Sequence, residues 1–337
     1  MAGDGGDRFV SELRLDPLSA EWITINANRL RRPVTTSAAG CPFCPVAADA
    51  PADVRARSEA PRSDYQVAVF PNRFPAFGGP GGAGEGADPT GGYVRAPAGG
   101  QAEIVLYSPV HETHLAGMPQ AQVELLVRVW ADRTRRMRAD PSVRYVFCFE
   151  NRGYSIGQTI DHPHGQIYGY PFVPPRVERE WTEVRRHRAE EGECLQCAIL
   201  RRETGAAARI VDREPGWLAF VPFAPRFPFE MHLVPTRHLG LLEELAPDEV
   251  AGLARLLQRT VRRYDGLHAQ PMAYMMCIFQ APVRAAPDLW HLRVAFYPVH
   301  RAQGKAKYLA GSESGAGAFL QDATPEATAG LLAGVRL

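Results

Sequence analysis

Two long segments of the chain carry apolar residues at helical spacing. In residues 120–138 and 248–264, apolar side chains recur three and four positions apart, which is typical of a helix with one buried face. The first set is Val123, Leu126, Val127 and Trp130, and the second is Val250, Leu253, Leu256, Leu257 and Val261. A more charged segment at 175–191 predicts an amphipathic helix that links two halves of the chain.

The other apolar runs are short, alternate with polar residues and end at proline or glycine, as antiparallel strands do. Their order is repeated, since residues 41–171 and 194–298 each read as a C-x-x-C pair, strands, a long helix and two further strands. This repeat predicts an α+β protein with antiparallel sheets, divided into halves at 1–174 and 175–337. The glycine-rich stretch 76–101 has no apolar period, and we expect a mobile loop there.

Composition narrows the class of protein. Lys and Arg total 38 against 37 Asp and Glu, so no global positive field exists to hold a nucleic acid. The N-terminus lacks a signal-peptide pattern, and no apolar run reaches the length of a membrane span. Four of the six cysteines form two C-x-x-C pairs, which favours metal binding in a reducing compartment. We therefore expect a soluble cytoplasmic protein with no membrane or nucleic-acid partner.

The first C-x-x-C pair indicates a zinc site. Cys41 and Cys44 supply two thiolates aimed at one point, and zinc prefers four such ligands in a tetrahedron. Histidines from later strands would complete the set, and His162 is one candidate. His111 and His114 are two others, between which spacing does not decide. Two buried thiols or a redox pair are the alternatives.

The segment around His164 is the candidate for chemistry. In an extended strand, residues two apart share a face, so His162, His164 and Gln166 point the same way. A neutral imidazole whose far nitrogen is hydrogen-bonded to a backbone carbonyl is a good nucleophile toward phosphorus. Nearby Gly157 allows close backbone approach, and the hydroxyl of Thr159 can donate to a phosphoryl oxygen. Two structural histidines are the alternative.

These motifs together resemble one family. The run H-P-H-G-Q-I-Y at 162–168, the upstream C-x-x-C and S-P-V-H motifs and D-P-L-S-A-E-W at 16–22 are similar to galactose-1-phosphate uridylyltransferases. That family is the transferase branch of the histidine-triad superfamily. The similarity spans essentially the whole chain. It implies two histidine-triad-like repeats, with antiparallel sheets forming a half-barrel flanked by helices, in a homodimer.

The resemblance also implies a reaction. His164 would attack the α-phosphorus of UDP-glucose, release glucose 1-phosphate and carry UMP as a uridylyl-histidine until galactose 1-phosphate accepts it. Superfamily hydrolases carry a third histidine at the position of Gln166, and a neutral amide there has no proton to shuttle to water. The enzyme would therefore take a nucleotide sugar and a sugar 1-phosphate as substrates.

Further roles follow from the resemblance alone. The metal ligands would be Cys41, Cys44, His111 and His162, so the family pattern selects His111 over His114. Gln166 would hydrogen-bond the phosphoryl group. The substrate-binding residues would be Arg29, Arg32, Asn72, Arg73, Asn151, Gly157, Gln158, Thr159, Lys307, Ser312, Glu313 and Gln321, and the last four would reach the hexose in the neighbouring subunit's site.

The sequence departs from the family at three places. Some members have an iron or zinc site built from a glutamate and three histidines. Glu180 fits, but Phe279, Arg293 and Ala295 replace the histidines, and we expect no such site. Other relatives, including plant-type ADP-glucose phosphorylases, repeat the zinc site in the second half. For that site we expect the ligands Cys194, Cys197, His238 and His291, the last being two residues beyond the usual position; a reduced cysteine pair is the alternative.

The third departure is Gln158, which is bulkier than the usual residue beside the phosphates and leaves the second substrate open. An ADP-glucose phosphorylase-like enzyme, or another nucleoside monophosphate transferase acting on a different sugar phosphate, is therefore an alternative function. A non-catalytic nucleotide-binding or zinc scaffold is a further alternative. It would predict a lost nucleophile, whereas His164 is present.

Overall fold

One long antiparallel sheet organises the molecule. The computed structural model describes residues 11–26, 38, 40–46, 55, 58–60, 65–78, 86–87 and 91–337. Its nine-stranded sheet runs in the order β3-β6-β8-β7-β12-β13-β11-β10-β9, and every neighbouring pair is antiparallel. The strands are β3 (Ala68–Pro71), β6 (Gln101–Leu106), β7 (Tyr145–Arg152), β8 (His164–Tyr170), β9 (Ile210–Glu214), β10 (Trp217–Phe220), β11 (Met231–Pro235), β12 (Tyr274–Phe279) and β13 (Arg293–Pro298). This confirms the predicted antiparallel α+β class.

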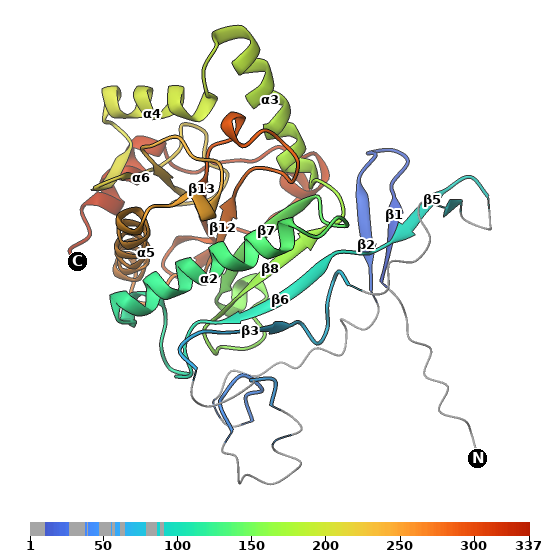
Figure 1. Cartoon of the computed structure of the whole chain (residues 1–337). Coiled ribbons are helices and arrows are strands. Elements are labelled where there is room, and N and C mark those ends of the chain that lie inside the picture. Colours follow the sequence, from blue (N-terminus) through green and yellow to red (C-terminus); the bar gives the residue numbers. More distant parts are fainter. Residues whose placement is uncertain are drawn as a thin grey trace.

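The two long helices have the predicted places and cover one face of this sheet (Figure 1). They are α2 (Gln120–Arg138) and α5 (Pro247–Leu267), and they pack against each other as well. Trp130 from α2 and Leu257 from α5 join Ile167 and Phe296 of the sheet in one buried core. The predicted apolar stripes are the faces that pack here, because burial of these side chains is the main stabilising contribution.

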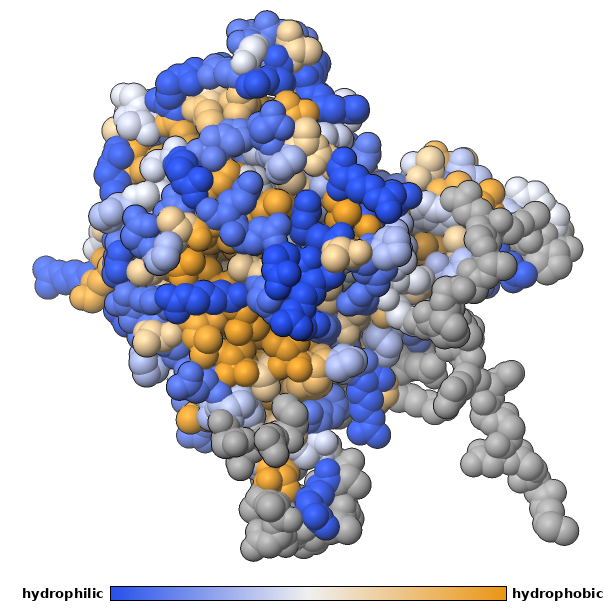
Figure 2. All heavy atoms as spheres, viewed as in Figure 1, coloured by the Kyte–Doolittle hydropathy of each residue, from blue (hydrophilic) through white to orange (hydrophobic). Residues whose placement is uncertain are grey.

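The opposite face of the sheet carries the connecting helix. α3 (Pro175–Glu191) is the predicted amphipathic segment, and its Val177 and Trp181 pack on Phe279 and Tyr297 of the sheet. α4 (Leu195–Ala206) follows directly, and α6 (Pro325–Ala333) packs on β9 and α5. The sequence pattern did not predict α4, since its apolar residues do not form one clear stripe. Figure 2 shows that polar side chains cover the outward side of α2, with an apolar area between α2 and strands β3 and β6.

A smaller sheet extends from this body (Figure 1). It has the order β2-β1-β5-β4, formed by β1 (Glu12–Leu15), β2 (Trp22–Ile25), β4 (Gly86–Ala87) and β5 (Val94–Pro97). The expectation of a loop over 76–101 is therefore wrong for β4 and β5, which are strands. Their backbone groups are satisfied by pairing with one another and by the pairing of β5 with β1, a long-range contact that has no local apolar signature. β14 (His300–Ala302) and β15 (Lys305–Ala306) form a separate hairpin.

No helix among the described residues combines the length and apolar character needed to cross a membrane.

Candidate active site and metal centres

Strand β8 sends its alternate side chains to opposite faces of the sheet. Ile167 lies in the core beneath α2, whereas Tyr168 packs in a separate cluster on the other face with Phe149. His164 and Gln166 share the face of Tyr168, as the period of two predicts. The catalytic candidates therefore lie on the side of the sheet that the two long helices leave uncovered.

The imidazole of His164 is held by the backbone two residues earlier. Its Nδ1 lies 2.7 Å from the carbonyl oxygen of His162. Because a carbonyl oxygen can only accept a hydrogen bond, Nδ1 carries the hydrogen and Nε2 carries the lone pair. Phe43 packs edge-on against the ring at a centroid distance of 5.0 Å and fixes its orientation. The hydrogen bond expected for a nucleophilic imidazole is thus present.

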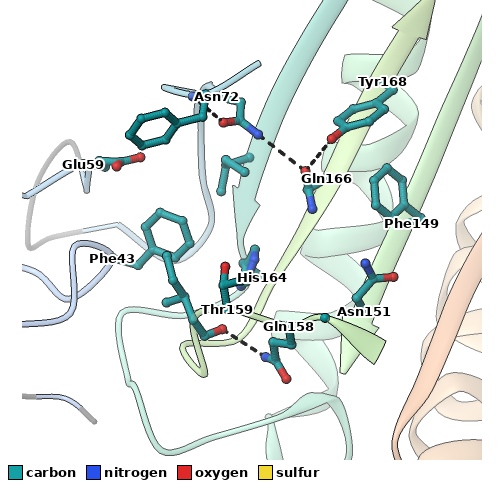
Figure 3. A pocket seen from close by; sticks show the side chains of 14 residues that line it. Phe43, Glu59, Asn72, Phe149, Asn151, Gln158, Thr159, His164, Gln166 and Tyr168 are labelled. Atoms are coloured by element: carbon teal, nitrogen blue, oxygen red, sulfur yellow. Dashed lines mark hydrogen bonds between the residues drawn. The ribbon is translucent and has the colours of Figure 1, made fainter. Parts of the chain in front are cut away.

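Gln166 is oriented by two donors on its amide oxygen. Its Oε1 accepts from Tyr168 Oη at 3.0 Å and from Asn72 Nδ2 at 3.4 Å. The amide nitrogen therefore faces the cavity above His164 (Figure 3). Asn72 is itself fixed, since its Oδ1 accepts from the backbone of Phe74 at 2.8 Å. The arrangement presents an N–H donor beside the imidazole, where an anionic oxygen would lie.

The cavity at His164 has a volume of about 220 Å³ and brings together residues from both ends of the first half. Besides His164, six predicted site residues line it: Asn72, Asn151, Gly157, Gln158, Thr159 and Gln166. Residues that sequence reasoning missed also line it, namely Phe43, Glu59, Phe74, Ile104, Phe149, Ile160 and Tyr168. The aromatic and aliphatic members carry no chemical motif, although alternation along β7 and β8 could have indicated Phe149 and Tyr168.

Gln158 acts within its own loop. Its Oε1 accepts from the backbone N–H of Gly153, and its Nε2 donates to the carbonyl of Ile160 at 3.1 Å. Both ends of the amide are therefore occupied by the segment 153–160 that borders the cavity. The large side chain of Gln158 thus stabilises the conformation of this loop.

Gly165 is required by the packing behind His164. A methyl group there would lie 2.3 Å from Tyr107 Oη and 3.0 Å from the carbonyl of Phe149. We expect Gly165→Ala to shift β8, lowering activity by about 10²-fold through misplacement of His164 and stability by about 1–3 kcal/mol. Thermal unfolding and turnover would be measured on the same preparation.

Tyr107→Phe supplies the matched control for that substitution. In the Gly165→Ala background it removes the hydroxyl that the new methyl group meets, so part of the lost activity and stability should return. Unchanged turnover in the single variant would contradict the packing argument.

The first C-x-x-C pair lies close to two histidines in the folded chain. The ligand atoms of Cys41, Cys44, His111 and His162 all lie within 4.8 Å of one another. Cys44 Sγ is 3.3 Å from His111 Nδ1 and 3.6 Å from His162 Nδ1, close to the edge of about 3.6 Å expected for a tetrahedral zinc site. His162 Nε2 lies 2.8 Å from the carbonyl of Ser108, which directs the Nδ1 lone pair to the cluster.

His114 lies apart from this group of ligands. Among the described residues, its buried Nδ1 has no hydrogen-bond partner, and its ring lines a second cavity beside Glu150 and Arg152. Burial lowers the pKa of His162 to about 4, so that imidazole stays neutral as a metal ligand requires. Cys41, Cys44, His111 and His162 together could therefore hold a metal ion.

A second cluster repeats the first. The ligand atoms of Cys194, Cys197, His238 and His291 also lie within 4.8 Å of one another. Cys197 Sγ is 3.4 Å from His238 Nδ1 and 3.5 Å from His291 Nδ1, while His291 Nε2 lies 2.9 Å from the carbonyl of Pro235. The geometry and the backbone acceptor match those of the first cluster, so this group could also hold a metal ion.

The carboxylate of Glu180 forms ion pairs with two arginines. It binds Arg293 at 2.9 Å and Arg176 at 3.0 Å. Burial alone would raise the pKa of Glu180, but the two guanidinium groups outweigh it and lower the pKa to about 2. The cationic side chain of Arg293 therefore pairs with this carboxylate, and Phe279 and Ala295 offer no ligand atom. These residues do not fit a metal site.

We expect Glu180→Gln to destabilise the protein by about 3 kcal/mol near neutral pH, because it leaves two partly buried guanidinium groups without their counter-charge. The folded pKa lies below the ordinary value, so the contribution is complete above about pH 5 and is lost as pH falls toward 2. Urea unfolding at pH 7 and pH 3 would test this: the difference between wild type and variant should shrink at the lower pH. Glu183→Gln, on the exposed side of the same helix, is the control.

Several predicted substrate-binding residues lie elsewhere. Arg29 and Arg32 fall outside the described residues. Among the described residues, the lining of the His164 cavity does not include Arg73, Lys307, Ser312, Glu313 or Gln321. Lys307 is buried, and its Nζ donates to Glu313 Oε1 at 3.0 Å and to the carbonyl of Leu320 at 2.6 Å. Arg73 lies near the cavity, where it opposes the increase in the pKa of Glu59 that burial causes.

Comparison with known proteins places the chain among characterised enzymes. Residues 6–174 match the family model of the galactose-1-phosphate uridyl transferase N-terminal domain, and residues 180–335 match that of the C-terminal domain. A galactose-1-phosphate uridylyltransferase of Thermotoga maritima is 36% identical over 327 residues, covering 94% of this chain and 96% of the relative. A solved uridylyltransferase structure superposes with a TM-score of 0.83 at 33% identity, covering 96% and 98% of the two chains. The ADP-glucose phosphorylase of Arabidopsis thaliana is 24% identical, covering 99% of this chain and 96% of the relative.

Proposed function

The chain belongs to the galactose-1-phosphate uridylyltransferase family, and from this premise we propose a double-displacement mechanism for it that proceeds through His164. The activity is the exchange of UMP between UDP-glucose and galactose 1-phosphate. The single observation that carries the mechanism is the contact of 2.7 Å between His164 Nδ1 and the His162 carbonyl. It leaves Nε2 as the nitrogen that attacks.

In the first step, His164 Nε2 bonds to the α-phosphorus of UDP-glucose while the bond from that phosphorus to the bridging oxygen breaks. Glucose 1-phosphate leaves with the electron pair, and the imidazole becomes a cationic uridylyl-histidine. The proton stays on Nδ1, where the carbonyl of His162 stabilises the added positive charge. In the second step, a phosphate oxygen of galactose 1-phosphate attacks the same phosphorus, and UDP-galactose leaves as the neutral imidazole returns.

Gln166 supports both transition states. Its amide nitrogen faces the cavity, so it donates to a non-bridging oxygen as negative charge develops there. Since an amide neither gives nor takes a proton at neutral pH, Gln166 does not activate water for hydrolysis of the intermediate. Thr159, Asn151 and the backbone at Gly157 complete the phosphate side, and Asn72, Arg73, Arg29 and Arg32 are assigned to the nucleotide.

We assign zinc to both cysteine–histidine clusters. Two thiols and two neutral imidazoles at tetrahedral spacing are the donor set that zinc prefers among common divalent ions. Zinc bound there would be structural, because all four positions are filled by the protein. The first cluster includes His162, whose carbonyl holds His164, so this site also fixes the nucleophile.

The hexose side of the cavity is assigned to a second copy of the chain in a homodimer. Lys307, Ser312, Glu313 and Gln321 are the residues proposed to reach it, and they are among the described predicted site residues that do not line the single-chain cavity. The boundary between the proposed N-terminal and C-terminal halves lies at residues 174 and 175, just before α3.

Mass spectrometry of the intact protein tests the proposed intermediate. After incubation with UDP-glucose alone, the mass should increase by one UMP, and galactose 1-phosphate should then remove it. ADP-glucose in a parallel sample distinguishes the alternative, since labelling by ADP-glucose only would indicate an enzyme similar to ADP-glucose phosphorylase. Turnover with no labelling on a rapid-quench timescale would contradict the covalent route.

A further inference from the structure

The sheet is a duplicated structure, and its registers identify equivalent residues in the two halves. Strands β7, β8, β6 and β3 lie in one direction from the centre, and β12, β13, β11 and β10 lie in the other. Gln166 pairs with Phe149 and Ile104 in the first half. Ala295 pairs with Cys277 and His232 in the second half. Ala295 therefore occupies the place of Gln166, and Arg293, two residues earlier, occupies the place of His164.

The metal clusters support this equivalence independently. His162 precedes His164 by two residues, and His291 precedes Arg293 by two. Both histidines are buried ligands that contact a backbone carbonyl through Nε2. The second half thus keeps the frame of the active site and replaces its nucleophile with a guanidinium group.

A cleft remains open at Arg293. Two adjoining cavities share Arg293 together with Leu195, Gln196 and Ile199 from the start of α4. The first, of about 350 Å³, is also lined by Arg176, Arg179, Arg226, Glu180 and Glu183. The second, of about 640 Å³, extends to Phe220, Phe223, Arg202, Arg209, Glu203 and His232. We call these two cavities together the Arg293 cleft.

The charges in the cleft leave a positive excess. Arg176 and Arg293 share the single carboxylate of Glu180, and the buried Nε of Arg293 has no hydrogen-bond partner in the part of the chain that the structure describes. Among the described residues, Arg226 forms no ion pair, and its guanidinium lies 5.1 Å from the ring of Phe319. Burial and, to a smaller extent, the nearby Arg176 lower the pKa of Arg226.

The remaining acidic groups are already neutralised. Glu203 pairs with Arg209 at 2.8 Å, and Glu183 pairs with Arg186 at 2.7 Å outside the cleft. His232 contacts Glu230 at 2.9 Å. Arginine is suited to phosphate recognition, since its planar donors match phosphate oxygens.

The wider cavity adds an apolar wall. Phe220 is buried at its base, and Phe223 is 75% exposed at its rim. An exposed aromatic ring beside a cationic pocket is the combination that holds a base and its phosphates.

We propose that the Arg293 cleft is a second, non-catalytic nucleotide site. It binds a nucleoside diphosphate, with the phosphates on Arg293 and Arg226 and the base against Phe223. No transfer occurs there, because a protonated guanidinium has no lone pair to attack phosphorus.

Equilibrium dialysis with UDP measures the number of sites per chain. We expect two in the wild-type protein. Arg226→Gln and Phe223→Ala should each weaken one site at least tenfold and leave the kcat and KM of uridylyl transfer unchanged. Arg201→Gln, which removes an exposed arginine of α4 paired with Glu193, is the matched control and should change neither site.

Two competition measurements show which parts of the ligand the second site recognises. Pyrophosphate and uridine should each compete more weakly than UDP at the site that Arg226→Gln affects. Equal competition by pyrophosphate would overturn the assignment of a nucleotide. A single UDP site that both cleft variants leave intact, with their thermal unfolding unchanged, would overturn the proposal as a whole. If the wild-type protein binds one UDP and both Arg226→Gln and Phe223→Ala weaken that binding, the result supports the second site and contradicts UDP binding at the proposed active site.

Discussion

Alanine at position 164 is expected to abolish uridylyl transfer while the fold and the metal content stay intact. The substitution removes the nitrogen proposed to bond to phosphorus, and no second imidazole and no thiol among the described residues lines that cavity. The expected loss in turnover is about 10⁴-fold or more, as for other covalent nucleophiles. Intact mass after incubation with UDP-glucose should show no added UMP.

A control variant separates the nucleophile from its surroundings. Tyr168→Phe removes one of the two donors to Gln166 Oε1 and leaves His164 in place. It should still accumulate the labelled intermediate, with a turnover reduced by about 10-fold as the amide loses part of its orientation. Transfer retained in His164→Ala at more than a small fraction of the wild-type rate would exclude the covalent route.

The second large effect is expected at the first metal cluster. Cys41→Ser should lower both zinc content and stability, because a structural site supplies on the order of 10 kcal/mol of binding energy that is available only to the folded protein. We expect one zinc per chain to be lost, and the free energy of unfolding to fall by several kcal/mol. Activity should fall as well, since the carbonyl that holds His164 belongs to the ligand His162.

Metal analysis and thermal unfolding would be compared with two other cysteine variants. Cys194→Ser should remove the second zinc and destabilise the other half of the chain. Cys277→Ser, which lies in neither cluster, should leave the metal content unchanged. Two zinc ions retained in Cys41→Ser would show that the assigned ligand set is wrong.

The local sequence pattern anticipated much of the framework. The stripes on α2 and α5 and the alternation along β8 depend on periods of 3.6 and 2, which are properties of neighbouring residues. The same is true of the C-x-x-C turns, since both thiols come from one short segment. These features could be read before any tertiary contact was known.

Other features of the site depend on contacts between distant segments. Cys44 and His111 are 67 positions apart, and Cys44 and His162 are 118 positions apart. Spacing alone left His111 and His114 equivalent, and only the packed fold directs one of them to the cluster. The orientation of the Gln166 amide likewise depends on Asn72, which is 94 positions away.

Sequence by itself therefore determined the antiparallel class, the two long helices, the duplicated order of elements and the identity of the candidate nucleophile. Tertiary structure decided which histidines lie beside which cysteines and which way the Gln166 amide faces. It also decided that Arg293 occupies the position equivalent to His164 in the second half, where it pairs with Glu180. The physical reason is the distance along the sequence between the residues that determine each feature. Helix and strand periods are set by adjacent backbone geometry, whereas ligand sets, ion pairs and clefts form only when the sheet brings remote segments together.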